Sequence, residues 1–291
     1  MRLLRDSAFL LLFLLGFNSC TGRVFSSKAP IVLQKAWASD NTLRTPESAL
    51  YAPAERAIYV SNINAHSGKA KDGDGFISRL NADGKMEQLH WAAGLNDPHG
   101  IALYNRVLYV ADIDEIVAIS TQTGAILGKY KADGAEYLND VAVDSKGTVY
   151  VSDMKQKRIY QLQNGRVSTW VNNTRREQPN GLFVKDDRLV VAFNSSGNVR
   201  FINLDTRNFT NWTEGIPSAD GIAELSNGNF LISSWEGEIF YVNKKGRKWQ
   251  VLDTRSEKIN SADISFDYDS GILLIPTFKD NRVLAYRVLA R

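Results

Sequence analysis

The sequence predicts an all-β protein, a six-bladed β-propeller with four-stranded blades, and three observations carry this prediction. A segment of one characteristic pattern recurs six times, with a period near 40 residues. Each copy is followed by further short runs rich in Val, Ile, Leu and Tyr, the residues enriched in β-strands. No amphipathic helix is evident after the N-terminal segment. The predicted propeller spans residues 31–291.

The repeated segments each combine a short apolar run, a polar turn and a second apolar run. They begin at Pro46, Pro98, Leu138, Pro179, Ala219 and Ser261. The second residues of successive copies are separated by 52, 40, 41, 40 and 42 residues. A period near 40 with about four strands per repeat is typical of propeller blades, so six copies predict six blades.

The chain begins with a segment typical of an export signal. Arg2 and Arg5 precede the apolar run AFLLLFLLGF, which is too short to span a bilayer comfortably. Residues 1–20 end at Cys20, the one cysteine of the chain, and resemble a lipoprotein-type signal peptide that is cleaved before this residue. The alternative is an ordinary secretory signal in which Cys20 has no special role.

Lipidation of Cys20 would make a membrane the partner of the N-terminus. Residues 21–30 would then form a linker between the lipid anchor and the propeller. Two acyl chains anchor a protein stably to a membrane surface. We therefore expect an exported protein of the bacterial cell envelope, with the propeller in the periplasm or at the cell surface.

The segment Ile31–Ala38 (IVLQKAWA) resembles a strand but precedes the first repeat. The last repeat ends after three strands, at Arg291. We expect the N-terminal strand to close the last blade as its missing outer strand, because joining the first and last blades in this way leaves few exposed strand edges.

The long first interval has a local cause, a polar and Gly-rich insertion at Asn62–Gly75 that contains His66. Its DGDG motif resembles the start of a calcium loop but lacks the downstream Glu of such loops, which favours a mobile insertion. In a binding protein, this insertion would be a candidate recognition loop.

Composition and charge exclude several functions. The formal net charge of +3 over 291 residues provides no electrostatic basis for binding nucleic acid. A single cysteine excludes an intramolecular disulfide and a Cys-rich zinc site. With 44% hydrophobic residues, the chain is able to bury a large core.

Residues at one position of every repeat form a ring around one mouth of a propeller tunnel. Here the ring is Glu47, His99, Asn139, Asn180, Asp220 and Ala262. Four members offer carboxylate or amide oxygens, and such hard oxygens suit Ca²⁺, which takes about six to eight of them. Another divalent cation is possible. The alternative interpretation is that His-Gly, Asn-Gly and Asp-Gly are ordinary turn residues.

The ring residues and their flanking sequences resemble the superfamily of gluconolactonase, senescence marker protein, diisopropyl fluorophosphatase and paraoxonase. The resemblance implies that Glu47 in TPESALY, Asn139 in LNDVAVD, Asn180 in PNGLFV and Asp220 in ADGIAEL bind a catalytic calcium. The segment NDPHGIAL is similar to the stretch of paraoxonase with a His beside the calcium, here His99. The positions matching a second calcium site of paraoxonase hold Ser48 and Gly221, so we do not expect that ion.

The resemblance implies a calcium-dependent hydrolase of a lactone or related ester, with a small molecule as its substrate. Asp220 would be the general base or the nucleophile, and His99 would position the substrate or move a proton. One alternative is a non-catalytic binding or sensor protein with a structural calcium. Another is a strictosidine synthase-like condensing enzyme, whose catalytic Glu has no evident counterpart here. The oligomeric state is not indicated.

Overall fold

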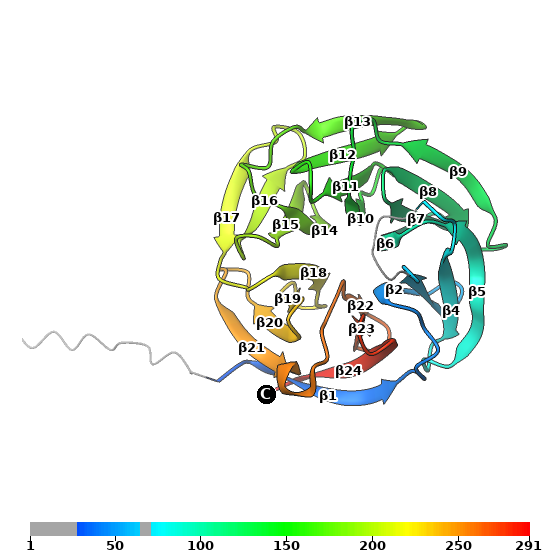
Figure 1. Cartoon of the computed structure of the whole chain (residues 1–291). Coiled ribbons are helices and arrows are strands. Elements are labelled where there is room, and N and C mark those ends of the chain that lie inside the picture. Colours follow the sequence, from blue (N-terminus) through cyan, green and yellow to red (C-terminus); the bar gives the residue numbers. More distant parts are fainter. Residues whose placement is uncertain (1–27, 65–70) are drawn as a thin grey trace, which may run out of the picture.

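The computed structural model describes residues 28–64 and 71–291. These residues form six four-stranded antiparallel sheets, arranged around a central axis as the blades of a propeller (Figure 1). The predicted fold class is confirmed. The described residues also contain one short 3₁₀ helix, Arg255–Glu257, and none of their helices is long and apolar enough to cross a bilayer.

Two predictions fall on residues outside this description. The signal peptide at residues 1–20, with Cys20 and most of the linker at residues 21–30, lies outside the described residues, as does His66 in the insertion. The lipid anchor therefore stays a prediction.

The strands of the first five blades run outward from the axis in chain order, and β1 is the outer strand of the sixth. The innermost strands are β2 (Pro46–Ala52), β6 (Pro98–Tyr104), β10 (Leu138–Val143), β14 (Pro179–Lys185), β18 (Ala219–Glu224) and β22 (Ser265–Asp267). The second strands are β3 (Ala57–Asn62), β7 (Val107–Asp112), β11 (Val149–Asp153), β15 (Arg188–Phe193), β19 (Phe230–Ser234) and β23 (Ile272–Thr277).

Two further strands complete each blade. The third strands are β4 (Gly75–Asn81), β8 (Glu115–Ser120), β12 (Arg158–Gln163), β16 (Val199–Asn203), β20 (Glu238–Val242) and β24 (Arg282–Ala290). The outer strands are β5 (Met86–Leu95), β9 (Ile126–Lys131), β13 (Arg166–Val171), β17 (Phe209–Thr213), β21 (Lys248–Asp253) and β1 (Ile31–Ala38).

The N-terminal strand closes the last blade, as predicted. β1 pairs antiparallel with β24 from Ile31 opposite Ala290 to Ala38 opposite Leu284. Backbone hydrogen bonds thereby join the N-terminal strand to the C-terminal strand, which closes the ring of blades (Figure 1).

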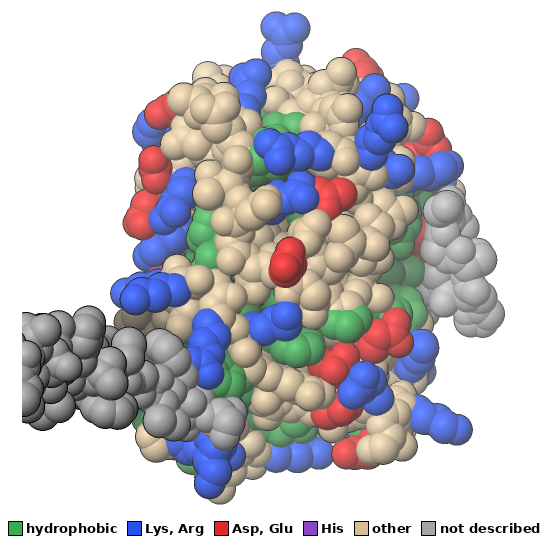
Figure 2. Space-filling model, turned by 90° about the vertical axis from the view of Figure 1, so that its left-hand side faces the viewer, with side chains coloured by type: hydrophobic (Ala, Val, Ile, Leu, Met, Phe, Trp, Pro, Cys, Tyr) green, Lys and Arg blue, Asp and Glu red, His purple; other side chains and the backbone are tan. Residues whose placement is uncertain are grey.

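The apolar core lies between neighbouring blades. Tyr59 and Ile77 of the first blade, for example, pack against Leu108 and Val110 of the second. Similar clusters fill the other junctions around the ring. Inner strands are covered on both faces and are mostly buried, whereas an outer strand such as β9 is largely exposed. Basic, acidic and uncharged side chains are interspersed on the outer face seen in Figure 2.

A β-bulge interrupts each of the five complete innermost strands near its start. The register shifts between the first and fourth residues, as from Leu138 to Val141, where three steps along β10 match two along β11. The same shift occurs in β2, β6, β14 and β18. A bulge redirects the side chains beside it. The side chains of the second and third residues of these strands therefore do not follow the usual alternation between the two faces of a sheet.

Serine hydroxyls on two second strands hold the bulges and connect neighbouring blades. Ser152 Oγ accepts a hydrogen bond from the backbone N–H of Asp140 and donates one to the carbonyl of Asn180 in the next blade, at 2.9 and 2.8 Å. Ser233 connects the N–H of Gly221 with the carbonyl of Ala262 in the same way. These bridges fix the distance between adjacent innermost strands.

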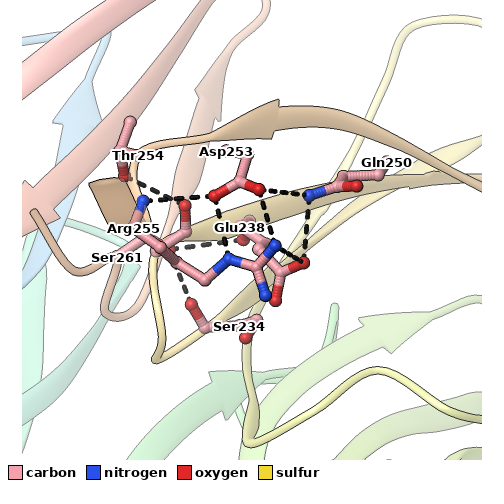
Figure 3. Close-up of polar contacts among 8 residues, drawn as sticks. Ser234, Glu238, Gln250, Asp253, Thr254, Arg255 and Ser261 are labelled. Carbon is pink, nitrogen blue, oxygen red and sulfur yellow. Dashed lines mark hydrogen bonds and ion pairs between the residues drawn. The ribbon is translucent and has the colours of Figure 1, made fainter. Parts of the chain in front are cut away.

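The sixth blade starts differently, because Ala262 precedes the short strand β22. A polar network at the end of the fifth blade holds the connecting segment (Figure 3). Arg255 donates to both carboxylate oxygens of Asp253, and Ser261 donates to the carbonyl of Ser234 at 2.8 Å. Asp263 then forms an isolated parallel bridge with Ser48, which closes the inner wall of the tunnel.

Glycine after the ring residue allows adjacent innermost strands to approach closely. A Cβ at Gly181 would lie 1.9 Å from the carbonyl oxygen of Asp220, a backbone atom that cannot rotate away. We expect Gly181→Ala to lower the free energy of unfolding by about 3 kcal/mol, the upper range for overpacked cores. Urea unfolding monitored by tryptophan fluorescence would measure the change.

The matched control is Gly128→Ala on the outer strand β9. There a Cβ would first meet the Tyr130 hydroxyl, the end of a flexible side chain, so we expect a change below about 0.5 kcal/mol. Equal stability of the two variants would contradict the close approach of β14 and β18.

Candidate functional site

The four residues predicted to bind a metal occupy equivalent places around the tunnel. Glu47, Asn139, Asn180 and Asp220 are each the second residue of an innermost strand, and each side chain is at most 5% exposed. His99 has the same place in β6. They lie within strands, at the bulges, and not in turns. Five of the six positions predicted from the repeat are therefore equivalent in their strands, whereas Ala262 precedes β22.

Three of these side chains carry a buried oxygen that has no hydrogen-bond partner among the described residues. They are Glu47 Oε2, Asn180 Oδ1 and Asp220 Oδ1. The amide nitrogen of Asn180 donates to the carbonyl of Ala219 at 3.3 Å, which leaves its oxygen as the free end. A buried acceptor without a partner destabilises a fold by about 1–3 kcal/mol. A bound cation would satisfy all three oxygens.

Two further carboxyl groups, Asp140 and Asp263, lie directly beneath the ring. Ser48 donates a 2.5 Å hydrogen bond to Asp263 Oδ2, while Asp140 accepts from the backbone N–H groups of Val141 and Leu182, both at 2.6 Å. Glycines make room for these groups, because a Cβ at Gly100 would lie 2.2 Å from Asp140 Oδ1. Neither acid was predicted as a site residue, although both occupy the position directly after the ring residue in their repeats.

The buried carboxyl groups raise one another's pKa values. Burial raises the pKa of Glu47 well above its usual value, and the nearby charges of Asp220 and Asp263 raise it further. Burial likewise raises the pKa of Asp263 to about 7, although the hydrogen bond from Ser48 acts in the opposite direction. Among the described residues, no Lys or Arg is fully buried, so the protein itself supplies no compensating cation in the tunnel.

His99 is part of a hydrogen-bonded pair at the edge of the ring. Its Nδ1 lies 2.8 Å from the carbonyl of Asp97, so this nitrogen carries the proton, and its Nε2 accepts from the Tyr137 hydroxyl at 3.0 Å. Burial lowers the pKa of His99 to about 4, which keeps the imidazole neutral. Burial raises the pKa of Tyr137, and the nearby charges of Glu47, Asp97 and Asp220 raise it further.

The donor chemistry of the ring fits a hard divalent cation. In residues 28–64 and 71–291, no three His, Cys, Asp or Glu side chains form a metal-binding group by themselves. A cation at the ring would therefore depend on the amide oxygens of Asn139 and Asn180 as well as on Glu47 and Asp220. Mixed carboxylate and amide oxygen ligands are usual for Ca²⁺.

Aromatic and polar residues surround the ring side of the tunnel. Trp235 follows β19, and its ring centroid lies 5.1 Å from that of Phe278, which follows β23. At the described end of the insertion, Lys71 forms an ion pair of 2.7 Å with Asp114. The DGDG motif forms a local turn in which Asp72 Oδ1 accepts from the N–H of Asp74.

Comparison with known proteins finds similarity of fold. No family model matches the chain, and no curated protein matches it. Similar solved structures include a streptogramin B lyase (TM-score 0.61, 13% identity, covering 89% of this chain and 97% of the lyase). Virginiamycin B lyase from Staphylococcus aureus is also similar (TM-score 0.64, 13% identity, covering 88% of this chain and 99% of the lyase). So is a candidate gluconolactonase (TM-score 0.66, 16% identity, covering 89% of this chain and 95% of that protein). At these low identities, the TM-scores show a shared propeller fold and nothing further.

The raised pKa of Asp263 predicts a pH-dependent loss of stability in the metal-free protein. A carboxyl group whose pKa is higher in the folded than in the unfolded chain stabilises the folded state. This contribution is complete at pH values below the unfolded pKa, near 3.8, and it is lost as the pH rises towards 7. The lowered pKa of His99 acts in the opposite sense, so the measurement must compare variants. We expect Asp263→Asn to gain stability relative to wild type, by up to about 1.4 kcal/mol per pH unit over this interval.

Urea unfolding with a chelator present, between pH 4 and 7, would measure the difference. Asp187→Asn, which changes an exposed carboxylate, is the control and should show no such trend. A constant difference between Asp263→Asn and wild type over this pH range would contradict the prediction.

Proposed function

We propose that the protein is a calcium-dependent hydrolase of lactones or related esters. The observation that carries the proposal is the set of three buried, unpartnered oxygens on Glu47, Asn180 and Asp220. They occur in a tunnel with four buried carboxyl groups and no fully buried Lys or Arg among the described residues. Such an arrangement is unfavourable in itself, and a divalent cation would compensate both the charge and the unmade bonds.

Glu47, Asn139, Asn180 and Asp220 would hold the calcium. When bound, calcium supplies Lewis-acid polarisation of the ester carbonyl and stabilises negative charge on its oxygen. The two carboxylates among the ligands balance the charge of the ion. Asp140 and Asp263 lie beneath the ring and add to the negative potential that attracts it.

Asp220 would act as the general base. Burial and the charge of Asp263 raise the pKa of Asp220 in the metal-free chain, and the charge of a bound calcium would lower it again, so that the carboxylate is ionised and able to accept a proton at neutral pH. It would take a proton from a water molecule as the water oxygen attacks the carbonyl carbon. The proton then passes to the alkoxide leaving group when the ester C–O bond breaks.

His99 and Tyr137 would position the substrate. Because His99 donates to the carbonyl of Asp97, the Tyr137 hydroxyl donates to His99. The oxygen of a hydroxyl group also accepts hydrogen bonds, so Tyr137 could contact a hydroxyl or amide of the substrate. His99 acts here as a support for Tyr137, since its low pKa makes it a poor proton carrier at neutral pH.

Calcium binding would stabilise the folded protein, because the ring is assembled only in the folded chain. At a calcium concentration 100 times the Kd, the expected gain is about 2.7 kcal/mol. Thermal unfolding with chelator and after calcium addition would measure it. Glu47→Gln removes one ligand charge and should reduce the shift, whereas Glu55→Gln, outside the ring, should leave it unchanged. A melting temperature indifferent to chelator and calcium would refute the site.

Hydrolysis would depend on Asp220. We expect wild type with calcium to hydrolyse members of a panel of sugar lactones, acyl-homoserine lactones and aryl esters, and Asp220→Asn to lose about 10²- to 10⁴-fold in kcat. Tyr137→Phe should raise KM more than it lowers kcat. Circular dichroism would check that both variants fold.

Calcium binding without turnover of any panel member would favour the alternative, a binding or sensor protein with a structural calcium. Undiminished hydrolysis by Asp220→Asn would remove this residue from the mechanism.

A further inference from the structure

The tunnel continues past the ring into a cavity of about 430 Å³ at the opposite mouth. Its walls are the later residues of the innermost strands, from the level of Ser48 and Asp263 to the turns at Pro53 and Asp269. The ring residues themselves are not among those that line it. The cavity is therefore a separate space, with the Asp140 and Asp263 layer as its floor.

The cavity combines apolar walls with carboxyl groups of one charge sign. Ile101, Leu103, Leu182 and Ile222 are among its apolar lining residues. Five carboxyl groups line it, those of Asp140, Glu224, Asp263, Asp267 and Asp269. No Lys, Arg or His is among the described residues that line it.

Two of the acids nearer the mouth already have partners. Glu224 forms an ion pair of 2.9 Å with Lys185, and Asp267 accepts hydrogen bonds from Asp269 and Ser270 in its own turn. Tyr268, 54% exposed, lies beside Phe266 with ring centroids 5.2 Å apart, so the mouth has aromatic surface available.

The floor presents an acceptor that the protein does not satisfy. Each carboxylate oxygen of Asp140 accepts a hydrogen bond from a backbone N–H, Oδ1 from Val141 and Oδ2 from Leu182, and these bonds hold the group in place. Asp263 is 8% exposed, and Ser48 occupies its Oδ2. No donor among the described residues hydrogen-bonds Asp263 Oδ1. A ligand that reaches the floor would therefore meet a fixed, buried acceptor with a second carboxyl beside it.

We propose that this cavity binds a small apolar amine, with its ammonium group on Asp263 and its apolar body against the strand walls. The volume suits a ring with a short chain, since ligand cavities typically measure about 300–1,000 Å³. An alkylammonium supplies both the hydrogen-bond donors and the charge that the floor lacks. An apolar body suits the walls better than a hydrated metal ion, and no three acids of the described residues converge as metal ligands.

Calorimetric titration of the calcium-loaded protein at neutral pH would test the proposal with three probes of similar shape: phenethylamine, 2-phenylethanol and 3-phenylpropionate. We expect phenethylamine to bind at least about tenfold more tightly than the alcohol, the usual advantage of a charged hydrogen bond. The carboxylate should not bind, because the acidic floor repels it. Saturating calcium keeps the ring occupied, so that amine binding reports on the opposite mouth.

Two variants locate the binding. Asp263→Asn should weaken phenethylamine binding about tenfold or more and leave 2-phenylethanol unchanged, whereas Asp269→Asn at the mouth is the matched control with little effect. Leu103→Trp should fill the cavity and abolish binding of both probes. Equal affinity for amine and alcohol, undiminished amine binding by Asp263→Asn, or undiminished binding by Leu103→Trp would each overturn the proposal.

Discussion

Uncompensated negative charge on the propeller axis is the constraint on which the site depends. Glu47, Asp140, Asp220 and Asp263 are buried close enough to raise one another's pKa values, and no Lys or Arg is fully buried among the described residues. Buried charges normally persist only when they are paired or bind a metal. The apolar clusters between blades stabilise the fold despite this arrangement, and the proposed calcium would compensate the charge in the tunnel.

The β-bulge at the start of the innermost strands contributes to both the fold and the site. The bulge at the start of an innermost strand turns two successive residues towards the axis region, so that ring residues such as Asn139 are followed by a second layer such as Asp140. Ser152 holds this bulge and the neighbouring strand in one hydrogen-bonded bridge. Glycines at the equivalent positions of other blades leave the space that the second-layer carboxylates fill. Fold and site therefore cannot be varied independently at these positions.

The periodic part of this architecture was predictable from the sequence, and the rest depends on contacts between blades. A position that recurs in every repeat, such as Asp220, defines a ring by symmetry. The segment Ile31–Ala38 could be assigned as the outer strand of the last blade, because that blade was the only one with a strand missing. Asp140 and Asp263 directly follow the ring positions Asn139 and Ala262, so the same symmetry could have predicted a second ring that contains them. Tyr137 was not predictable, because its contact with His99 joins two blades and because the equivalent positions of other repeats hold unrelated residues such as Thr45 and Gln178.

The two ends of the tunnel are electrostatically linked through the carboxyl layer between them. Asp263 raises the pKa of Glu47 and Asp220, so a positive charge bound on one side of this layer changes the potential felt on the other. Calcium at the ring would favour the ionised form of Asp263 and at the same time repel an ammonium group resting on it. Coupling between two binding sites is reciprocal, so whichever effect dominates must appear equally in the affinity for calcium and for the amine. A propeller tunnel with charge concentrated at its middle is thus suited to communication between its two mouths without any movement of the blades.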